Sequence, residues 1–420
     1  MSIEIRRLTP DDAPRLLDLD DYAFVNDPTR PDRDRGLEQV DWERAFGATR
    51  QGAHVGSYLV HDLRLAAPGP LGGITTHPLD GLSWVAVHPD HRRRGVLAAM
   101  MAHHVQQARE RGATWSGLHA SDPAIYGRYG YAVASLDVRL EFGGGTALTA
   151  PPVVEEQAAG VELTTIFDVG HDDVTQRVRT ITRACSDTAI GTVTWPDGKL
   201  HGALRDEPEA RRGTEPLRGV VARRDGTDVG VALYSRTLSW EPDGTTDGQL
   251  HVMLIQARDP GVLLALARRL LAEDLMRTIT FGDRGFDDPL LWWASGPRAV
   301  NVRVVDGLWL RPIDVGAALS ARGYAAACDV VLDVADDLGP WNTGAWRLRV
   351  GTDGAGRCEP TSRAADVRLR VQALGSAYLG LRGWGALAAC GDVQELRPGA
   401  LAELTAAFAT SAAPVGGLMF

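Results

Sequence analysis

Residues 83–101, SWVAVHPDHRRRGVLAAMM, carry the most informative pattern of the chain. Residues 83–87 have strand character and are followed by a proline, whereas residues 92–94 are all arginine. Gly95 then precedes an apolar pattern with the spacing of an amphipathic helix. This order predicts a strand, a turn and a helix over residues 93–111.

The arginines and the glycine indicate a site for a phosphate-bearing ligand. A helix N-terminus offers unpaired N–H groups and partial positive charge, and glycine lets the backbone approach a bulky anion closely. Arginine adds charge-assisted hydrogen bonds to phosphate oxygens. The alternative is a solvated charge cluster, which the helix dipole disfavours at this end. Neither GxxxxGK-S/T nor a GxGxxG after a strand is present, so the turn is not of the P-loop or dinucleotide type.

Length and composition describe a globular protein of several domains. The 420 residues predict two or three domains, and 44% hydrophobic with 23% charged residues allow a sizeable core. The formal net charge of −10 argues against a nucleic-acid partner, which would need a basic face. The same charge is compatible with a cationic substrate, although surface solubility explains it as well.

The cysteines and the hydropathy pattern indicate a cytoplasmic protein. Cys185, Cys328, Cys358 and Cys390 are far apart and form no CxxC pair, so neither a zinc site nor a disulfide framework is expected. His103 and His104 are adjacent on one helix and cannot share a face, so no metal site is predicted there. No apolar run approaches membrane-spanning length, and we expect no membrane partner.

The first third of the chain alternates strands and helices, which predicts an α/β layer fold. Gly112 ends the long helix, in the position where left-handed backbone is usually needed. The further elements expected in this part are strands at residues 3–8, 56–65, 82–87, 114–120 and 131–142, and helices at 13–24 and 124–129. A Gly- and Pro-rich break at residues 143–152 marks a domain boundary.

The second segment contains a possible internal repeat. Residues 251–271 parallel the opening stretch, with Gly261 in the place of Gly95, but the arginines are missing and Asp259-Pro260 stands before the glycine. Either this is a degenerate copy that kept the strand, turn and helix and lost the anion site, or two short apolar helices merely look alike. Strands at residues 219–224 and 229–236 flank an Asp-Gly turn.

The last segment predicts an α+β domain. Its strands at residues 329–334, 346–350 and 366–371 alternate in polarity, which indicates a half-exposed antiparallel sheet. A helical pattern at residues 399–411 follows.

The turn of the opening stretch resembles motif A of the GNAT acetyltransferases, in the form Arg92-x-x-Gly95-x-Leu97 after VAVHPDHR. Leu97 departs from the small residue usual there, and Ala98 follows. The resemblance implies acetyl-CoA as co-substrate, with no metal. The implied pantetheine contacts are Val85, Ala86 and Val87, and the implied pyrophosphate contacts are Arg93, Arg94, Gly95, Val96, Leu97 and Ala98.

A second stretch, HASDPAIYGRYGYAV at residues 119–133, resembles the fifth strand and the following helix of the same family. Tyr126 matches the family's general acid, whose hydroxyl protonates the departing thiolate, and tyrosine retains its proton at neutral pH. Core packing is the alternative for any tyrosine, and we prefer it for Tyr129 and Tyr131. Ser121 and Asp122 fall where the family contacts CoA.

The whole chain resembles the enhanced intracellular survival (Eis) family of N-acetyltransferases, as DGLWLRPIDVGAAL, LGSAYLG and the aromatic last residue indicate. The resemblance implies an α/β plus α+β chain with two GNAT-type domains, the second degenerate, and a sterol-carrier-protein-like domain. We expect the catalytic domain at residues 1–148, the degenerate domain at 149–299 and the third at 300–420. It further implies direct acetyl transfer, through a ternary complex, to amines of aminoglycosides or polyamines at several positions, and a homohexamer.

The family resemblance also gives the C-terminus a role. An ammonium group has no lone pair, so the attacking amine needs a general base. In the Eis family this base is the carboxylate of the last residue, which here is Phe420. The tail APVGGLMF at residues 413–420 is apolar and glycine-jointed, which suits a terminus inserted into a cleft. A frayed terminus is the alternative.

Other assignments stay open at the level of sequence. His119 could line the acceptor pocket or be structural, and Asp21, Asn26 and Asp27 could bind an amine, although a solvated acidic loop is the favoured interpretation. The alternatives to the proposed activity are protein-lysine acetylation and a non-catalytic ligand or lipid carrier built on the last domain. Pocket shape decides the acceptor amine, the number of positions modified and the acyl length, and whether the last domain binds a ligand is also open.

Overall fold

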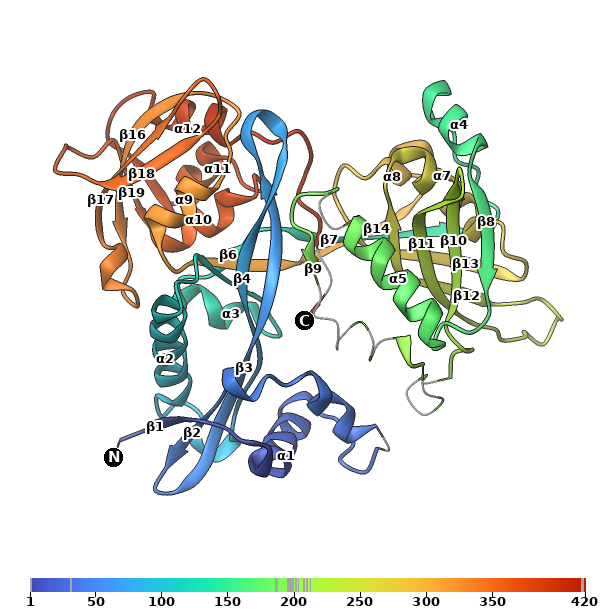
Figure 1. Cartoon of the computed structure of the whole chain (residues 1–420), viewed down its shortest axis with the longest axis horizontal. Helices are drawn as coiled ribbons and strands as arrows, with labels where there is room; N and C mark the ends of the chain where they lie inside the picture. The colour runs from blue at the N-terminus through green and yellow to red at the C-terminus, as the bar shows by residue number, and fades with distance from the viewer. Residues whose placement is uncertain are drawn as a thin grey trace. The chain divides into compact units, whose positions relative to one another are not determined.

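The structure, a computed structural model, forms two compact units (Figure 1). Unit 1 comprises Met1–Ser135, Asp306–Pro414 and Met419–Phe420, and unit 2 comprises Leu136–Val305 and Val415–Leu418. The residues that the structure describes are 2–30, 32–185, 188–194, 200, 202, 204–206, 208, 211, 213–416 and 419–420. Among these residues, no helix combines the length and the apolar character needed to cross a bilayer.

The N-terminal part of unit 1 is a mixed sheet with the strand order β1-β2-β3-β4-β5-β15-β6. The strands are β1 Glu4–Arg7, β2 Ala45–Arg50, β3 Ala53–Pro68, β4 Ile74–Val87, β5 Trp115–His119, β6 Ala132–Val133 and β15 Leu308–Pro312. β4 and β5 run parallel, and the other neighbours are antiparallel. β15 comes from a distant part of the sequence and lies between β5 and β6.

Helices cover both faces of this sheet. Figure 1 shows α1 and α2 on either side of the long β3–β4 hairpin. Leu16 of α1 packs with Leu59, whereas Met100 of α2 packs with Tyr58, the neighbouring residue of the same strand. The helical segments are η1 Pro10–Asp12, α1 Ala13–Phe24, η2 Arg33–Gln39, η3 Trp42–Arg44, η4 Pro70–Gly72, η5 Pro89–His91, α2 Val96–Glu110, α3 Pro123–Tyr126 and η6 Gly127–Tyr129. The expected helix at 13–24 and the end at Gly112, with φ of 75°, are confirmed.

The C-terminal part of unit 1 has a sheet with the order β18-β17-β16-β19-β20. Its elements are α9 Val315–Ala321, β16 Cys328–Ala335, η8 Pro340–Asn342, β17 Gly344–Val350, β18 Gly356–Pro360, β19 Val367–Arg370, α10 Val371–Tyr378, α11 Trp384–Ala389, β20 Val393–Glu395 and α12 Ala400–Phe408. Alternating burial along β19 confirms a half-exposed sheet. The prediction of an antiparallel sheet was wrong for one pair of strands. The chain crosses back after β18, so β19 pairs with β16 in parallel.

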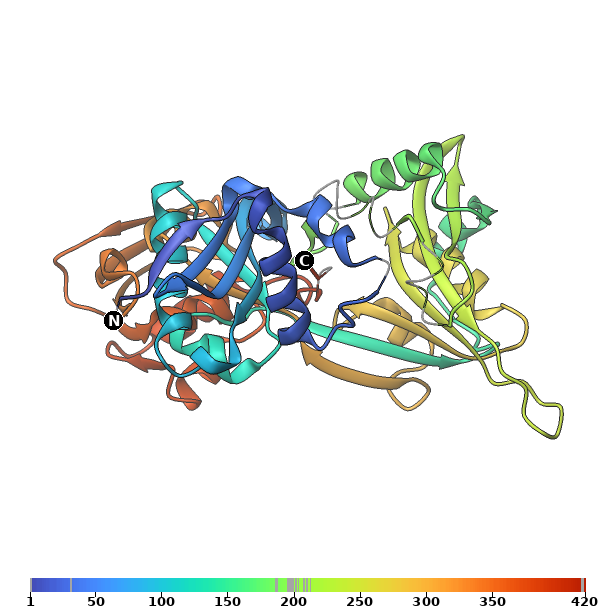
Figure 2. The same ribbon diagram turned by 90° about the horizontal axis from the view of Figure 1, so that it is seen from below.

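Unit 2 contains one sheet with the order β14-β7-β13-β12-β11-β10-β8. Its strands are β7 Leu136–Gly143, β8 Glu162–Ile166, β10 Arg218–Arg224, β11 Thr227–Thr237, β12 Gly248–Ala257, β13 Met276–Arg284 and β14 Asn301–Asp306, and β9 Val193–Thr194 is a short further strand. Its helices are α4 Pro152–Ala159, α5 Asp172–Ala184, α7 Pro260–Leu271 and α8 Pro289–Trp293. Figures 1 and 2 show α5 along one face of β10, β11 and β12. Val231 packs on the α5 side, and its neighbour Ala232 packs on the α7 side.

Two local predictions for unit 2 are confirmed. Residues 251–271 form a strand, a turn and a helix, namely β12 and α7. The Asp-Gly turn joins β10 to β11, with φ of 50° at Asp225 and 75° at Gly226. Both angles lie in the left-handed region that such a two-residue turn requires.

The strand expected at residues 131–142 is interrupted, because the chain changes units there. β6 belongs to the sheet of unit 1 and β7 to that of unit 2. The N–H groups of Ala134 and Ser135 both donate to the Leu308 carbonyl, at 2.8 and 3.2 Å, and Ser135 Oγ accepts from Leu308 N at 3.0 Å. The N–H groups of Ala134 and Ser135 are therefore not available to continue the pairing of β6 with β15. The domain borders expected at residues 148 and 299 stay predictions.

Candidate active site

The paired part of β4 and β5 ends in the middle of the sheet of unit 1. Their parallel pairing runs from Leu79 and Trp115 to Gly81 and Gly117, whereas β4 continues to Val87. The β3–β4 register shifts in the same region, and Trp84 has a φ of 51°. The backbone of β4 beyond Gly81 therefore has groups on its β5 side that this ladder does not use.

The predicted pantetheine contacts lie on that stretch. Val85 and Val87 are half-buried and Ala86 is buried. An extended strand with unused N–H and C=O groups can hydrogen-bond an extended amide chain, as an added strand would. The arrangement fits the pantetheine arm of acetyl-CoA, and the contacts themselves stay a prediction.

The predicted phosphate turn connects β4 to α2. Arg93 and Gly95 have φ values of 59° and 84°, and Gly95 is the N-cap of α2, whose first N–H groups therefore have no capping side chain. Arg92, Arg93 and Arg94 are exposed, and within the described part of the chain they have no ion-pair partner. Uncapped N–H groups beside unpaired guanidinium groups fit a pyrophosphate. The helix begins at Val96, so the arginines lie in the turn and not in the helix as the spacing had suggested.

The remaining predicted phosphate contacts form the first turn of α2. Val96 is buried and packs in the core that also holds Met100, Leu97 is half-buried, and Ala98 is exposed. Their side chains thus mainly anchor the helix. A ligand at this end would meet their backbone N–H groups.

Tyr126 lies at the end of the short helix α3, which follows β5. The Asp122 carboxylate caps this helix by accepting from Ala124 N at 2.9 Å, and Ser121 and Asp122 are exposed. Tyr126 is only 6% exposed. Burial, with smaller contributions from Asp122 and Tyr129, raises the pKa of Tyr126 to about 12. The phenol therefore keeps its proton at neutral pH and can act as a donor, whereas Tyr131 lies in the core as expected.

Phe420 lies where β4 and β5 part. Ser83 Oγ donates a hydrogen bond to a terminal carboxylate oxygen of Phe420 at 3.0 Å. The Phe420 ring meets the His119 ring edge to face, with 5.1 Å between the centroids. A side chain at Gly81 would come within 2.9 Å of the Phe420 ring. The last residue is thus held against the sheet and not frayed, although its role as base stays a prediction, and Gly417 and Leu418 of the predicted tail lie outside the described residues.

Sequence reasoning missed Ser83 and Gly81. Ser83 supplies the hydroxyl that meets the terminal carboxylate, and Gly81 supplies the space for the Phe420 ring. An isolated glycine inside a strand pattern often marks a close approach, so Gly81 was a usable signal. No comparable sequence signal pointed to Ser83.

A buried hydrogen-bond network supports the strands under the site. Ser116 Oγ donates to the Asp80 carbonyl at 3.1 Å and also lies 2.8 Å from both His104 Nε2 and Tyr131 Oη. Since a serine hydroxyl has one proton, His104 Nε2–H and the Tyr131 hydroxyl must be the donors. Burial lowers the pKa of His104 to about 3, so the ring is neutral with Nδ1 deprotonated. His104 is therefore a structural group.

Arg311 of β15 fixes the turn that follows Tyr126. Its side chain is fully buried and donates from Nε to the Tyr129 carbonyl at 2.8 Å. Its Nη2 donates to both carboxylate oxygens of Asp336, at 2.8 and 3.0 Å. The Asp336 carboxylate also accepts from Gly339 N at 3.0 Å and from Asn342 Nδ2 at 2.9 Å. The charge of this buried pair is thus fully compensated.

The acidic residues after the first helix are not a solvated loop throughout. Asp21 is buried and pairs with Arg30 and with Arg33, whose Nε lies 2.6 Å from Asp21 Oδ2. Asp27 Oδ1 accepts from Thr29 N at 2.8 Å, as in a local turn. Asp21 therefore has a structural role, and no further function is assigned to Asn26.

Family models match the chain in three places. Residues 4–134 and residues 191–312 match models of the acetyltransferase (GNAT) domain, and residues 315–416 match the sterol carrier protein domain. The second match resolves the alternative left open for residues 251–271 in favour of a GNAT copy.

Known proteins resemble the chain over its length. A Streptomyces avermitilis protein named uncharacterized N-acetyltransferase is 35% identical, over 99% of this chain and 98% of its own. The N-acetyltransferase Eis of Mycobacterium bovis is 32% identical, over 85% of this chain and 83% of its own. The crystal structure of Eis1 from Mycobacterium abscessus has a TM-score of 0.83 at 28% identity and covers 99% of this chain and 100% of its own. The chain therefore belongs to the Eis family of GNAT N-acetyltransferases.

Proposed function

We propose that the enzyme transfers the acetyl group of acetyl-CoA to primary amines of aminoglycosides and other polyamines, at several positions of one acceptor. The observation that carries the proposal is the Phe420 carboxylate, which lies beside Ser83 at the point where β4 and β5 part. The predicted pantetheine contacts follow on β4 and the predicted phosphate turn comes after that strand, so the position of Phe420 supports a base near the expected thioester.

Acetyl-CoA supplies the activated acetyl group, and the residues of the chain move the protons. The Phe420 carboxylate accepts a proton from the amine, whose lone pair then forms the C–N bond as the C–S bond breaks. Tyr126 donates a hydrogen bond, and then its proton, to the departing sulfur. Once the C–N bond has formed, the nitrogen loses its second surplus proton, which restores Tyr126 through solvent, and the Phe420 carboxyl releases its proton to bulk water. No acetyl-enzyme forms, so both substrates are bound together.

The test is a thiol-release assay with acetyl-CoA and an aminoglycoside that has several amines. We expect turnover by the wild type, and a loss of about 10²- to 10⁴-fold in kcat for Tyr126→Phe and for a chain extended by two residues after Phe420. Tyr129→Phe, which removes a neighbouring hydroxyl, and the same two residues inserted in the exposed turn at Gly244 are the matched controls. Full activity of the extended chain would refute the base assignment.

Two comparisons separate the other candidate functions. Faster turnover on lysine peptides than on aminoglycosides would favour a protein-lysine acetyltransferase. If CoA does not raise the melting temperature, the chain does not bind it, and a non-catalytic carrier becomes the better proposal.

We also propose a homohexamer as the functional assembly. The support is the family membership alone. Light scattering after size exclusion should give six times the mass of the chain, which is 45.1 kDa. A monomer at micromolar concentration would contradict the proposal.

A further inference from the structure

Unit 2 has a cavity of about 250 Å³ that the proposed reaction does not use. The end of β12, the start of α7, the end of β13 and the start of α8 line it. Its lining includes Met253, Ala257, Asp259, Pro260 and Asp283.

This cavity, the second cleft, lies at the place in unit 2 that corresponds to the predicted acetyl-CoA site of unit 1. In unit 1 the order is β4, α2, β5 and α3, and in unit 2 it is β12, α7, β13 and α8. β12 and β13 are parallel neighbours whose pairing ends at Val252 and Phe281, whereas β12 continues to Ala257. The register between β12 and the preceding strand also shifts, as in unit 1. The open edge of β12 thus lines the cavity, and it corresponds to the open edge of β4 at the predicted acetyl-CoA site.

The phosphate end of this second cleft is closed. The Asp259 carboxylate caps α7 by accepting from Val262 N at 3.0 Å, and it pairs with Arg224, whose Nη1 lies 2.6 Å from Asp259 Oδ2. Pro260 at the first helical position has no N–H to offer. A carboxylate where a pyrophosphate would lie repels an anion, so the cleft does not suit CoA.

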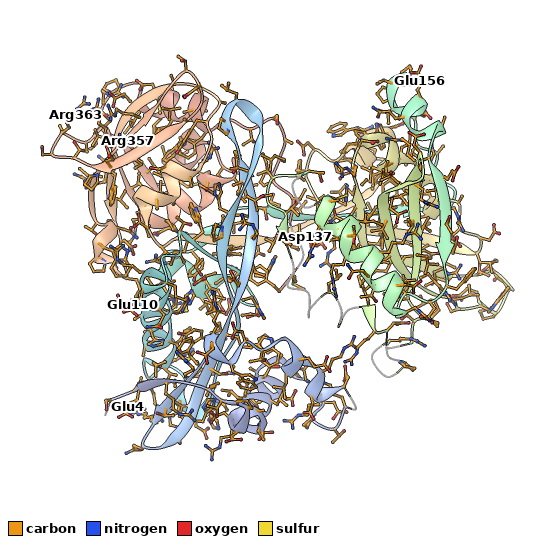
Figure 3. The ribbon with its side chains drawn as sticks, viewed as in Figure 1. Glu4, Glu110, Asp137, Glu156, Arg357 and Arg363 are labelled. Atoms are coloured by element: carbon orange, nitrogen blue, oxygen red, sulfur yellow. The ribbon has the colours of Figure 1, made fainter. Side chains whose placement is uncertain are left out.

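At the opposite end the cleft offers an acid. The two parallel ladders end at Gly117 and at Phe281, so Asp283, two residues on, corresponds to His119, which lies beside the predicted reaction centre of unit 1. Asp283 N donates to Asp137 Oδ1 at 3.0 Å, and Figure 3 labels Asp137 on β7. Within the described residues the Asp283 carboxyl has no ion-pair partner. Arg284, its neighbour, is engaged with Asp288, with Nε 2.7 Å from Oδ2.

We propose that the second cleft binds a small linear amine, with the ammonium group on Asp283 and the chain along the open edge of β12. The acid provides the charge that an ammonium ligand needs, and the capped helix excludes phosphate ligands. A cavity of about 250 Å³ is smaller than the roughly 300–1,000 Å³ of pockets for drug-sized ligands, so the ligand is a short diamine and not an aminoglycoside. The site rests on unit 2 alone and does not depend on the proposed acetyl transfer.

The test is calorimetric titration of the full chain with 1,5-diaminopentane in the absence of acetyl-CoA. Asp283→Asn should weaken the binding by about tenfold or more, because a charge-assisted contact is lost. Asparagine tolerates the φ of 54° at this position, so the fold should survive, as the melting temperature will show. Asp225→Asn removes the same charge in an exposed turn of unit 2 and is the matched control.

Thiol release with an aminoglycoside separates this site from the active site. Asp283→Asn should show the weakened diamine binding and retain turnover. If diamine binding persists in Asp283→Asn and is lost in the chain extended after Phe420, the diamine occupies the active site and the proposal is wrong. Loss of both binding and turnover in Asp283→Asn would also overturn it. A wild type without turnover refutes the proposed function but leaves this titration interpretable.

The pH dependence gives a second readout of the same site. Burial, followed by the nearby Asp137, raises the pKa of Asp283 to about 7, while Arg139 and Arg284 act in the opposite direction. Arg258 and Asp259 are the other charged groups that line the cavity. Diamine affinity should therefore rise between about pH 6 and pH 8, as the carboxyl ionises and the diamine remains protonated. A flat profile would contradict the contact with Asp283.

Discussion

At the scale of single residues, Tyr126 and Phe420, the two groups proposed to transfer protons, have opposite environments. Tyr126 is buried, which favours its neutral form and keeps it a donor. The Phe420 carboxylate accepts a hydrogen bond from Ser83, which favours the charged form that a base needs. Burial of Tyr126 and the hydrogen bond to Phe420 therefore fit the roles of acid and base that we propose for them.

Replacing Ser83 tests the environment of the base. In Ser83→Ala the carboxylate loses a donor, so its protonated form becomes relatively more stable. The acid limb of the kcat/KM profile should move to higher pH, so that kcat/KM falls a few-fold on that limb. Ser83→Thr keeps the hydroxyl and should restore the wild-type limb. An unchanged limb in Ser83→Ala would show that the carboxylate does not control it.

The pKa of Tyr126 predicts how kcat depends on pH on the alkaline side. Because the folded-state pKa is raised to about 12 from an ordinary value of 10.0, the proton is retained to higher pH. We expect no loss of kcat assignable to Tyr126 below about pH 10. An alkaline limb below that pH that disappears in Tyr126→Phe would contradict this expectation.

At the scale of elements, the N-terminus of α2 and the strand β15 serve the site in different ways. The turn before α2 presents its arginines outward for a ligand. β15 turns Arg311 inward, where it binds the backbone after Tyr126. In the proposed mechanism, the turn before α2 would bind acetyl-CoA and β15 would position Tyr126.

Charge reversal in the turn should affect the binding of acetyl-CoA more than the chemistry. Arg94→Glu puts a carboxylate beside the helix N-terminus and should raise the KM for acetyl-CoA by about tenfold, with kcat little changed. The effect should shrink at high salt, because Arg94 is exposed. Arg303→Glu on the exposed face of β14 makes the same charge change and is the control. If Arg94→Glu and Arg303→Glu raise the KM for acetyl-CoA equally, the effect comes from the net charge of the protein and not from a contact with Arg94.

Arg311 is expected to be a positioning residue for Tyr126. Arg311→Lys keeps a positive charge for Asp336 but loses the bond to the Tyr129 carbonyl, so kcat should fall while the KM for acetyl-CoA stays the same. In a Tyr126→Phe background the same change should have little further effect on kcat.

Arg322→Lys is the matched control for this cycle. Arg322 is 1% exposed and donates from Nε to the Tyr378 carbonyl at 2.8 Å, in the C-terminal part of unit 1. The Arg322→Lys substitution should lower the melting temperature without a specific loss of kcat. If Arg311→Lys and Arg322→Lys reduce kcat equally, Arg311 is merely structural.

At the scale of the whole molecule, the chain builds unit 1 from both of its ends. It leaves the first sheet after Ser135 and returns with β15, and its last residue lies against β4. The tip of the β3–β4 hairpin is bonded to the C-terminal part, with Gly323 N donating to the Pro68 carbonyl at 2.8 Å. The N-terminal sheet is therefore incomplete without residues from the C-terminal part.

A fragment of residues 1–148, the catalytic domain expected from sequence, should be inactive. It lacks β15, which pairs with both β5 and β6, and it lacks the carboxylate of Phe420. We expect poor solubility or a loss of cooperative melting, and no thiol release with acetyl-CoA and an aminoglycoside. Adding residues 300–420 in trans is the complementation control. Turnover by the fragment alone would contradict the role of the terminal carboxylate.

Much of the fold could be predicted from sequence, because the signals were local. The helix at residues 13–24 and the Asp-Gly hairpin each depend on capping, turn chemistry or periodicity within a few residues. The split of the strand at residues 131–142 could not be predicted, because it depends on bonds to Leu308. The role of Asp21 was missed for a similar reason, since its partners Arg30 and Arg33 reach it only after the loop has folded.

The sequence by itself determined the strand, turn and helix around Gly95, because backbone conformation and charge at a helix start are properties of adjacent residues. The family and its co-substrate were indicated by the resemblance of this turn to motif A of the GNAT acetyltransferases. Only the tertiary structure decided that Phe420 meets Ser83, 337 residues away, and that Arg311 holds the turn after Tyr126. It also decided that Asp283 lines a second cleft. Such contacts depend on the path of the whole chain through its sheets, which no local pattern encodes.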